Sequence, residues 1–220
     1  SIAHDLRTPI TVMKGYTEYL SHNVPLGRIS EDKLMDTIHN LSLATDRLEQ
    51  YANQVREIQA MDAIPVKPTA CPLREFFEEQ EDEYTVLAHQ HQLQFSMDIS
   101  GVPDFQVMLD GTLVHRMIDN VISNALRFAC HEIALKAGWQ EGILTIQVYD
   151  DGAGFSEESL RSATRPFYKE NTENDHFGLG LSICNTLCQK QGGTLSLSNR
   201  NGACVEMQIQ AEKLMPIDQS

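Results

Sequence analysis

A histidine, an aspartate and a threonine lie close together near the start of the chain, at His4, Asp5 and Thr8. Residues four positions apart share one face of a helix, so a helix here would place Thr8 over the same surface as His4. Asp5 would lie about 100° round the helix from His4, within reach of the ring. A carboxylate that accepts a hydrogen bond from Nδ1–H fixes the tautomer and leaves Nε2 as a nucleophile. The spacing therefore predicts one solvent-facing reaction centre, although these residue types are also common on ordinary exposed helices.

A second group of functional residue types follows one side of the segment 112–128, at Asn120, Asn124, Arg127 and Phe128. Their steps of four, three and one place them on a single helix face. An unsatisfied amide in a core costs about 1–3 kcal/mol, so such a polar face requires a partner. Phosphate groups with a bound metal ion would supply one, and hydrogen bonds to neighbouring backbone are the alternative. The pattern alone leaves both possibilities open.

Two glycine-containing stretches lie further along the chain. Residues 148–155, VYDDGAGF, end a predicted strand in DxGxG, where glycines let the backbone approach a ligand or adopt positive φ. A carboxylate at that strand end can accept the exocyclic amine of adenine, although the bare motif also fits a simple turn. Residues 176–183, HFGLGLSI, open a helix whose free N–H groups and dipole suit phosphate. Between them, residues 165–169, RPFYK, are typical of an ordinary loop when taken alone.

These motifs occur in the order found in one enzyme family. Residues 4–16, HDLRTPITVMKGY, resemble the phosphoacceptor box H-[DE]-L-R-T-P-L-T of the sensor histidine kinases of two-component systems, and Lys14, Gly15 and Tyr16 match its continuation. The four later motifs resemble the N, G1, F and G2 boxes of the GHKL ATPase fold. The resemblance covers essentially the whole chain, and it implies that His4 is the phosphoacceptor.

The resemblance also implies how Mg-ATP would be bound by the N and G1 boxes. Asn124 would ligate Mg²⁺, Arg127 would approach the phosphates and Phe128 would pack on adenine. Asn120 would lie near the reacting phosphate. In the G1 box, Asp150 rather than the aspartate after it aligns with the adenine-binding residue.

The F and G2 boxes imply a lid over the nucleotide. Phe167 would pack this lid, and Lys169 would reach the γ-phosphate. Gly178 and Gly180 keep the centre of the G2 box, but a histidine and a phenylalanine at 176–177 replace its usual first two residues. This departure leaves the path of the lid open. Together the four boxes imply nucleotide-binding roles for Asn120, Asn124, Arg127, Phe128, Asp150, Gly152, Gly154, Phe167, Lys169, Gly178, Leu179, Gly180 and Leu181.

The N-terminal motif is expected on a helical hairpin. Mostly apolar residues recur at steps of four or three from Ile2 through Ile10 to Leu20, and at alternating steps of four and three over 34–59, which is typical of a coiled-coil seam. A lone pair of helices cannot cover such a seam, so we expect two copies to form a homodimeric four-helix bundle. An intramolecular bundle with later helices is the alternative, but prolines at 65, 68 and 72 interrupt the chain at this point.

The elements predict three parts of the chain. Residues 1–64 form the dimerisation and phosphoacceptor hairpin, residues 65–72 a linker, and residues 73–215 a catalytic ATP-binding domain. The expected fold is an all-α hairpin followed by an α+β two-layer sandwich of the GHKL (Bergerat) type, with a mostly antiparallel sheet. Helices are predicted at 73–89, 112–128 and 178–191, strands at 93–99, 131–137, 142–149, 194–198 and 203–210, a short apolar segment at 106–110, and a loop at 150–177.

Composition narrows the choice of partners and location. The net charge of −14, from 17 basic and 31 acidic residues, argues against binding to nucleic acid or anionic membranes, which depends on clustered Lys and Arg. A nucleotide held by a local Arg or Lys remains compatible. Five scattered cysteines without a CxxC pair indicate a reducing cytosol. No run approaches the roughly 20 apolar residues of a membrane-spanning helix. The family resemblance implies the cytoplasmic portion of a bacterial receptor that is membrane-anchored through an upstream segment.

The expected function is autophosphorylation of His4 from Mg-ATP and transfer of the phosphoryl group to an aspartate of a response-regulator receiver domain, with Thr8 orienting water when that partner is dephosphorylated. Whether the nucleotide reaches His4 of its own copy or of the second copy depends on the handedness of the loop 24–29. One alternative is another GHKL enzyme, such as an anti-sigma-type serine kinase or an ATP-driven clamp, which would lack the hairpin. A second is an ATP-binding scaffold without turnover. The intact His4, Asp5, Asn124, Asp150 and Gly152 weigh against it, and the altered G2 box leaves it open. Neither the signal nor the cognate regulator is encoded in this stretch.

Overall fold

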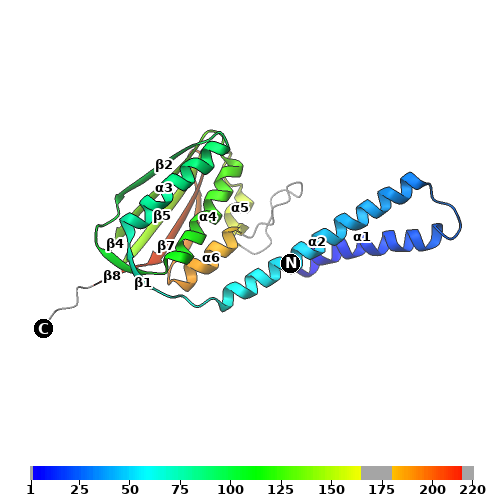
Figure 1. The fold of residues 1–220 in the computed structure, drawn as a ribbon, viewed down its shortest axis with the longest axis horizontal. Coiled ribbons are helices and arrows are strands. Elements are labelled where there is room, and N and C mark those ends of the chain that lie inside the picture. The colour runs from blue at the N-terminus through cyan, green and yellow to red at the C-terminus, as the bar shows by residue number, and fades with distance from the viewer. Residues whose placement is uncertain (1, 165–179, 215–220) are drawn as a thin grey trace. The chain divides into compact units, whose positions relative to one another are not determined.

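The computed structural model describes residues 2–164 and 180–214, and the chain divides into two compact units between Ala63 and Ile64 (Figure 1). The first unit holds two helices, and the second holds all of the strands and the remaining helices. The side chains of residues 2–5 and of several residues between 47 and 63 lie outside the description.

The first unit is a hairpin of α1 (Ile2–Asn23) and α2 (Glu31–Ala63). Gly27 in the connecting loop has a φ of 62°, a left-handed conformation that glycine adopts without strain. Ser30 caps α2, because its side-chain oxygen accepts a hydrogen bond from the Lys33 N–H at 3.3 Å. Local sequence therefore determines where the hairpin turns and where its second helix begins.

The contact between α1 and α2 buries only part of the apolar surface of the hairpin. Pro9, Thr37 and Ala44 are buried in the hairpin, whereas Ile10, which the periodicity assigned to the seam, is 51% exposed. The buried Thr37 hydroxyl is satisfied, because it donates to the Lys33 carbonyl at 2.7 Å. The hairpin by itself thus leaves apolar surface uncovered. Among its described side chains, the exposed large apolar ones are Ile10, Val12, Tyr19, Val24, Leu26, Met35, Ile38 and Leu43.

The second unit is built on a five-stranded sheet in the order β2-β4-β5-β7-β6. β2 and β4 are parallel, and the other neighbours are antiparallel. Alternation along β5 buries Leu144, Ile146 and Val148 on one face, while Gln147 on the other face donates a hydrogen bond to Glu206. The strands are β2 (Gln94–Gly101), β4 (Glu132–Gln140), β5 (Ile143–Asp150), β6 (Thr194–Asn199) and β7 (Ala203–Gln210).

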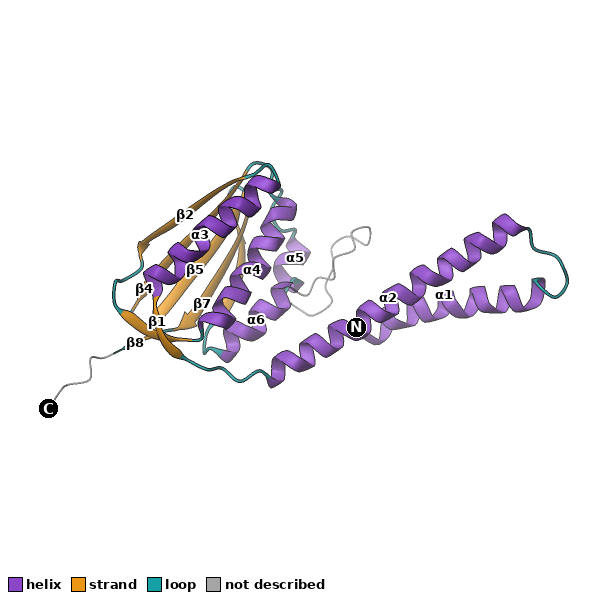
Figure 2. Cartoon of the chain, in the orientation of Figure 1, coloured by secondary structure: helices purple, strands orange, loops and turns teal. Residues whose placement is uncertain are grey.

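Helices α3, α4 and α6 cover the apolar face of this sheet (Figure 2). Met117, Ile118 and Val121 of α4 are almost completely buried beneath it. The Asp110 side chain caps α4, because Oδ1 accepts a hydrogen bond from the Leu113 N–H at 3.2 Å. This two-layer arrangement confirms the predicted α+β sandwich. The helices are α3 (Leu73–Gln90), α4 (Gly111–Phe128), α5 (Glu157–Ser162) and α6 (Gly180–Lys190).

A small antiparallel sheet in the order β1-β3-β8 joins segments that are far apart in sequence. It contains β1 (Thr69–Pro72), β3 (Gln106–Leu109) and β8 (Glu212–Lys213). Residues 69–72, expected in the linker, therefore belong to a strand. The expected loop 150–177 likewise contains α5, which Ser156 caps by accepting a hydrogen bond from the Ser159 N–H at 3.1 Å.

Two tight turns connect neighbouring strands as predicted. Glu141 and Gly142 both have positive φ, 50° and 86°, in the two-residue loop between β4 and β5. Between β6 and β7, Gly202 packs so closely on the end of β5 that an added Cβ would lie 1.9 Å from the Asp150 carbonyl oxygen.

Among the helices of the described segments, none is long and apolar enough to cross a membrane.

Candidate functional site

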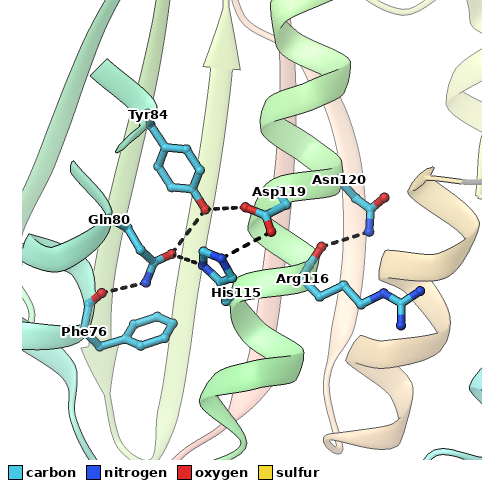
Figure 3. Close-up of polar contacts among 7 residues, drawn as sticks. All are labelled: Phe76, Gln80, Tyr84, His115, Arg116, Asp119 and Asn120. Atoms are coloured by element: carbon cyan, nitrogen blue, oxygen red, sulfur yellow. Dashed lines mark hydrogen bonds and ion pairs between the residues drawn. The ribbon is translucent and has the colours of Figure 1, made fainter. Parts of the chain in front are cut away.

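The polar face of α4 offers side chains that the fold itself does not use. The Asn120 side-chain NH₂ donates to the Arg116 carbonyl at 2.8 Å (Figure 3), which leaves its oxygen available. The Asn124 amide makes no hydrogen bond to any residue within 2–164 and 180–214, and it is only partly buried. The Arg127 guanidinium carbon lies 5.1 Å from the centre of the Phe128 ring, which is 52% exposed. This end of α4 therefore presents an amide, a cation and an aromatic ring to a ligand.

The start of α6 lies beside Asn120. A Cβ added to Gly180 would lie 3.7 Å from both the backbone and the side-chain oxygen of Asn120. Gly180 is the first described residue of α6, so this end of the helix lies close to α4 at Asn120. The Leu181 side chain is 8% exposed and packs in the core, so only its backbone could contact a ligand here.

Asp150 ends β5 with a carboxylate that is 9% exposed. Its Oδ1 accepts hydrogen bonds from the Gly152 N–H at 2.9 Å and the Ala203 N–H at 3.4 Å. Its Oδ2 has no hydrogen-bond partner in the described part of the chain. Burial raises the pKa of this carboxyl, and the two backbone N–H groups partly oppose that rise. One oxygen therefore fixes the side chain and the other can accept a hydrogen bond from a ligand.

Asp151 has a different environment from its neighbour. Its Oδ1 accepts hydrogen bonds from the N–H groups of Cys130, His131 and Glu132 at 2.8, 2.9 and 3.2 Å, and its Oδ2 lies 2.9 Å from His131 Nδ1. The backbone N–H bonds, chiefly from His131, hold the pKa of this carboxyl well below its usual range. Asp151 therefore fastens the start of β4 to the end of β5, and both of its oxygens are already used.

The loop after Asp150 packs against the end of α4. A Cβ added to Gly152 would lie 2.2 Å from the Phe128 carbonyl oxygen, which is closer than any real contact. Only glycine permits this approach, and it brings Asp150, Phe128 and the loop into one region. The glycines of the DxGxG motif thus serve close packing of the protein backbone as well as access for a ligand.

Asn199 holds the other end of this loop, and the sequence analysis missed it. Its Oδ1 accepts a hydrogen bond from the Phe155 N–H, and its NH₂ donates to the Phe155 carbonyl, both at 2.8 Å. Gly154 between them has a φ of 78°, and a Cβ there would lie 2.9 Å from Asn199 Oδ1. Asn199 directly precedes a turn sequence, so its own pattern indicates only a turn residue.

A polar cluster joins α3 to α4 beside Asn120 (Figure 3), and the sequence analysis missed it too. The Gln80 NH₂ donates to the Phe76 carbonyl at 2.6 Å, so its Oε1 is the acceptor that faces His115 Nδ1 at 3.0 Å. The Tyr84 hydroxyl donates to Asp119 Oδ1 at 2.8 Å, and Asp119 Oδ2 lies 3.4 Å from His115 Nε2. Gln80 and Tyr84, four residues apart on α3, thus face His115 and Asp119, four residues apart on α4.

Two family models match the chain in succession. One is described as the His Kinase A (phospho-acceptor) domain and matches residues 1–64. The other is described as histidine kinase-, DNA gyrase B- and HSP90-like ATPase and matches residues 109–213. The chain belongs to the sensor histidine kinases.

Individual relatives agree with this assignment. The sensor histidine kinase SpaK of Bacillus subtilis is 26% identical over 215 residues, which cover 95% of this chain and 46% of SpaK. Full-length ShkA in complex with AMPPNP has a similar fold, with a TM-score of 0.66, 16% identity, and coverage of 94% of this chain and 47% of that one. The histidine kinase ThkA in complex with the response regulator TrrA also has a similar fold, with a TM-score of 0.64 and 20% identity. The match covers 95% of this chain and 59% of that one. This kinase chain spans between a third and two thirds of the length of the first curated relatives.

The structure brings most of the predicted nucleotide-site residues of this kinase together. Gly180 lies beside Asn120 and Gly152 lies beside Phe128, so α6, α4 and the end of β5 surround one region. In the hairpin, Thr8 is exposed on α1, the same helix that carries His4 and Asp5. The side chains of His4 and Asp5 are outside the description, as are the whole residues Phe167, Lys169, Gly178 and Leu179.

Proposed function

We propose that the chain is the catalytic core of a two-component sensor kinase, which binds ATP in the second unit and transfers its γ-phosphoryl group to His4. The observation that carries this proposal is the unpartnered Oδ2 of the buried Asp150 carboxylate. A carboxylate only accepts hydrogen bonds, so it selects a donor such as the exocyclic amine of adenine. Gly152 lies beside it and packs against the Phe128 backbone, and the exposed Phe128 ring offers a face on which a base can stack.

The residues around this position fit a magnesium nucleotide. The amide of Asn124 lacks a partner among the described residues, and its oxygen is the kind of hard ligand that Mg²⁺ prefers. Arg127 supplies a cation on the same helix, and the N–H groups at the start of α6 suit phosphate oxygens. The similar fold of ShkA, whose structure holds AMPPNP, supports this location. Lys169 and Phe167 complete the site in our proposal by way of the family resemblance.

In the proposed reaction, His4 Nε2 forms a bond to the γ-phosphorus. The bond from that phosphorus to the oxygen bridging to the β-phosphate breaks, and ADP leaves with the electron pair. Asp5 accepts the hydrogen bond from Nδ1–H and so holds the reactive tautomer. Bound Mg²⁺ supplies neutralisation of the phosphate charge, and Asn120, Arg127 and Lys169 balance the rest.

The partners we propose are a second copy of the chain and a response regulator. The apolar side chains left exposed on the hairpin, among them Ile10, Met35 and Ile38, fit burial between two hairpins in a four-helix bundle. The regulator's aspartate would receive the phosphoryl group from His4, and Thr8 would orient water when the regulator is dephosphorylated. The matching fold of ThkA, whose structure contains the regulator TrrA, supports such a partner. We also propose attachment to a membrane through residues upstream of this chain, and a functional division into residues 1–64, 65–72 and 73–215.

The decisive experiment uses ATP labelled at the γ-phosphate in the presence of Mg²⁺. The wild-type chain is expected to retain label that is labile to acid and stable to alkali, as a phosphohistidine is, and His4→Gln is expected to retain none. His22→Gln is the matched control, because His22 is exposed at the end of α1. Absence of label on the wild type, or full labelling of His4→Gln, would overturn the proposal.

A second experiment separates nucleotide binding from assembly. Asn124→Ala is expected to abolish Mg-ATP binding while light scattering still reports a dimer. Ser123→Ala is the control, because Ser123 is exposed on the same helix. Loss of the dimer in Asn124→Ala would contradict the assignment of dimerisation to the hairpin alone.

A further inference from the structure

The segment that joins the two units is fastened to the catalytic unit at successive points. The Ile64 carbonyl accepts a hydrogen bond from the Lys190 ammonium group at 3.0 Å. The Lys67 N–H donates to Asp110 Oδ2 at 2.8 Å. From Thr69 onward the chain is paired with β3. Residues 64–72 are therefore a connecting segment attached to the catalytic unit rather than a free tether.

These attachments lie on the two helices that carry the candidate nucleotide site. Lys190 is the last residue of α6, whose first residue, Gly180, lies beside Asn120. Asp110 directly precedes α4 and caps it through Oδ1 while Oδ2 holds the linker. α4 and α6 lie side by side (Figure 1), so each one runs from the linker to the nucleotide site.

Both bonds involve charged groups in protected positions. Asp110 is 8% exposed, and each of its oxygens accepts a backbone N–H, so neither bond is exchanged easily for water. Lys190 is half-buried, and a cation at the end of α6 is also favoured by the helix dipole. Hydrogen bonds to charged groups are stronger than those between neutral groups, so two of them can keep a short segment in place.

We propose that Lys190 and Asp110 are positioning residues for phosphoryl transfer, and this inference rests on the function proposed above. They hold residues 64–67 on the catalytic unit, so the hinge between the hairpin and the nucleotide site lies at the end of α2. A short hinge keeps His4 at high effective concentration near bound ATP. Loss of the two bonds would free residues 64–67 and lengthen the tether. The effective concentration of His4 near ATP would then fall, while the residues that bind the nucleotide would be unchanged.

The first test is Lys190→Met in the full chain, which removes the ammonium group and keeps an unbranched side chain. We expect the kcat of autophosphorylation to fall about 3- to 10-fold, because effective concentration decreases with tether length. The KM for ATP stays within twofold, and Lys190→Arg restores kcat. Lys136→Met is the control, because Lys136 is exposed on β4 and pairs only loosely with Asp98, at 4.0 Å. A rise in the ATP KM with unchanged kcat, or wild-type kinetics, would overturn the inference.

The second test is Asp110→Asn, read by hydrogen exchange as well as by activity. Asparagine still caps α4 with its one oxygen, but it cannot accept both N–H groups at once. We expect faster exchange of the Lys67 amide and the same selective loss of kcat. If the wild type exchanges this amide at the rate of an unstructured peptide, the attachment does not exist and the inference fails. If the wild type takes no label from ATP while the amide is protected, the proposed function fails instead.

Discussion

The Tyr84 hydroxyl on α3 donates a hydrogen bond to Asp119 Oδ1 on α4 at 2.8 Å, one residue before Asn120 (Figure 3). Tyr84 is 2% exposed, and burial together with Asp119 raises the pKa of its phenol, so the hydroxyl stays a donor throughout the physiological range. Apolar packing lets a helix rotate slightly about its axis, whereas a directed bond does not. This contact therefore opposes rotation of the part of α4 that carries Asn120 and Asn124.

The first prediction concerns the energy of this contact. Tyr84→Phe and Asp119→Ala each weaken the catalytic unit, and a double-mutant cycle is expected to give a coupling of about 0.5–1.5 kcal/mol, the usual net value of one hydrogen bond. Urea unfolding followed by the fluorescence of Trp139, the only tryptophan in the sequence, reports this unit selectively. Tyr19→Phe on the hairpin is the control and should change nothing in the Trp139 signal. A coupling below about 0.3 kcal/mol would contradict the positioning role, because additive effects indicate independent sites.

Periodicity was enough to predict α4 and its polar face. Eight buried apolar residues recur along this helix, so the same spacing that identifies its core side also places Asn120, Asn124 and Phe128 on the other. The tight turn at Glu141 and Gly142 was equally accessible, because few residues tolerate positive φ. The helix periodicity and the turn sequence depend only on residues close together in the chain, so both could be predicted without knowledge of the fold.

Contacts between distant segments could not be predicted in the same way. Tyr84 meets Asp119 across 35 positions, and Asn199 meets Phe155 across 44, so no local pattern announces either pair. The four-residue strand β1 is too short to show alternation and was assigned to a linker. The different roles of Asp150 and Asp151 also emerge only when the partners of each oxygen are known.

The second prediction separates these two neighbouring carboxylates. Asp150→Asn replaces one carboxylate oxygen with an NH₂ group, which faces the ligand while the remaining oxygen accepts from Gly152. The Kd for ADP is expected to rise about 10- to 100-fold, as for a lost hydrogen bond to a charged group. Asp151→Asn leaves the nucleotide position untouched and should change that Kd less than twofold. Calorimetric titration measures both. Equal losses of affinity in the two variants would contradict the assignment of adenine binding to Asp150.

The third prediction concerns stability as a function of pH. The folded state depresses the pKa of Asp151, so this residue contributes stability above the unfolded pKa of about 3.9, and the contribution is lost as the pH falls toward the folded value. Asp151→Asn is expected to cost about 1 kcal/mol near pH 7, at the low end for an unpaired donor because the N–H groups of Cys130, His131 and Glu132 can reach water. The difference in melting temperature between wild type and variant should shrink below about pH 4. A difference that is constant from pH 7 to pH 3 would show that the charge of Asp151 is not responsible.

The last prediction compares a glycine packed against backbone with a glycine that has open space around it. Gly152→Ala forces a Cβ to within 2.2 Å of the Phe128 carbonyl oxygen, and because this obstacle is backbone, the loop or the end of α4 has to move. Overpacking of this kind costs about 1–3 kcal/mol, and the Kd for ADP should rise at least tenfold as Asp150 and Phe128 separate. Gly15→Ala on α1 adds a Cβ with no atom within 4 Å, so it should stabilise the hairpin by about 0.8–1 kcal/mol through helix propensity alone. Trp139 fluorescence reports the first change, far-ultraviolet circular dichroism reports the second, and ADP binding must be unaffected in Gly15→Ala. Wild-type ADP affinity in Gly152→Ala would show that the close packing of this loop on α4 is not required for the nucleotide site.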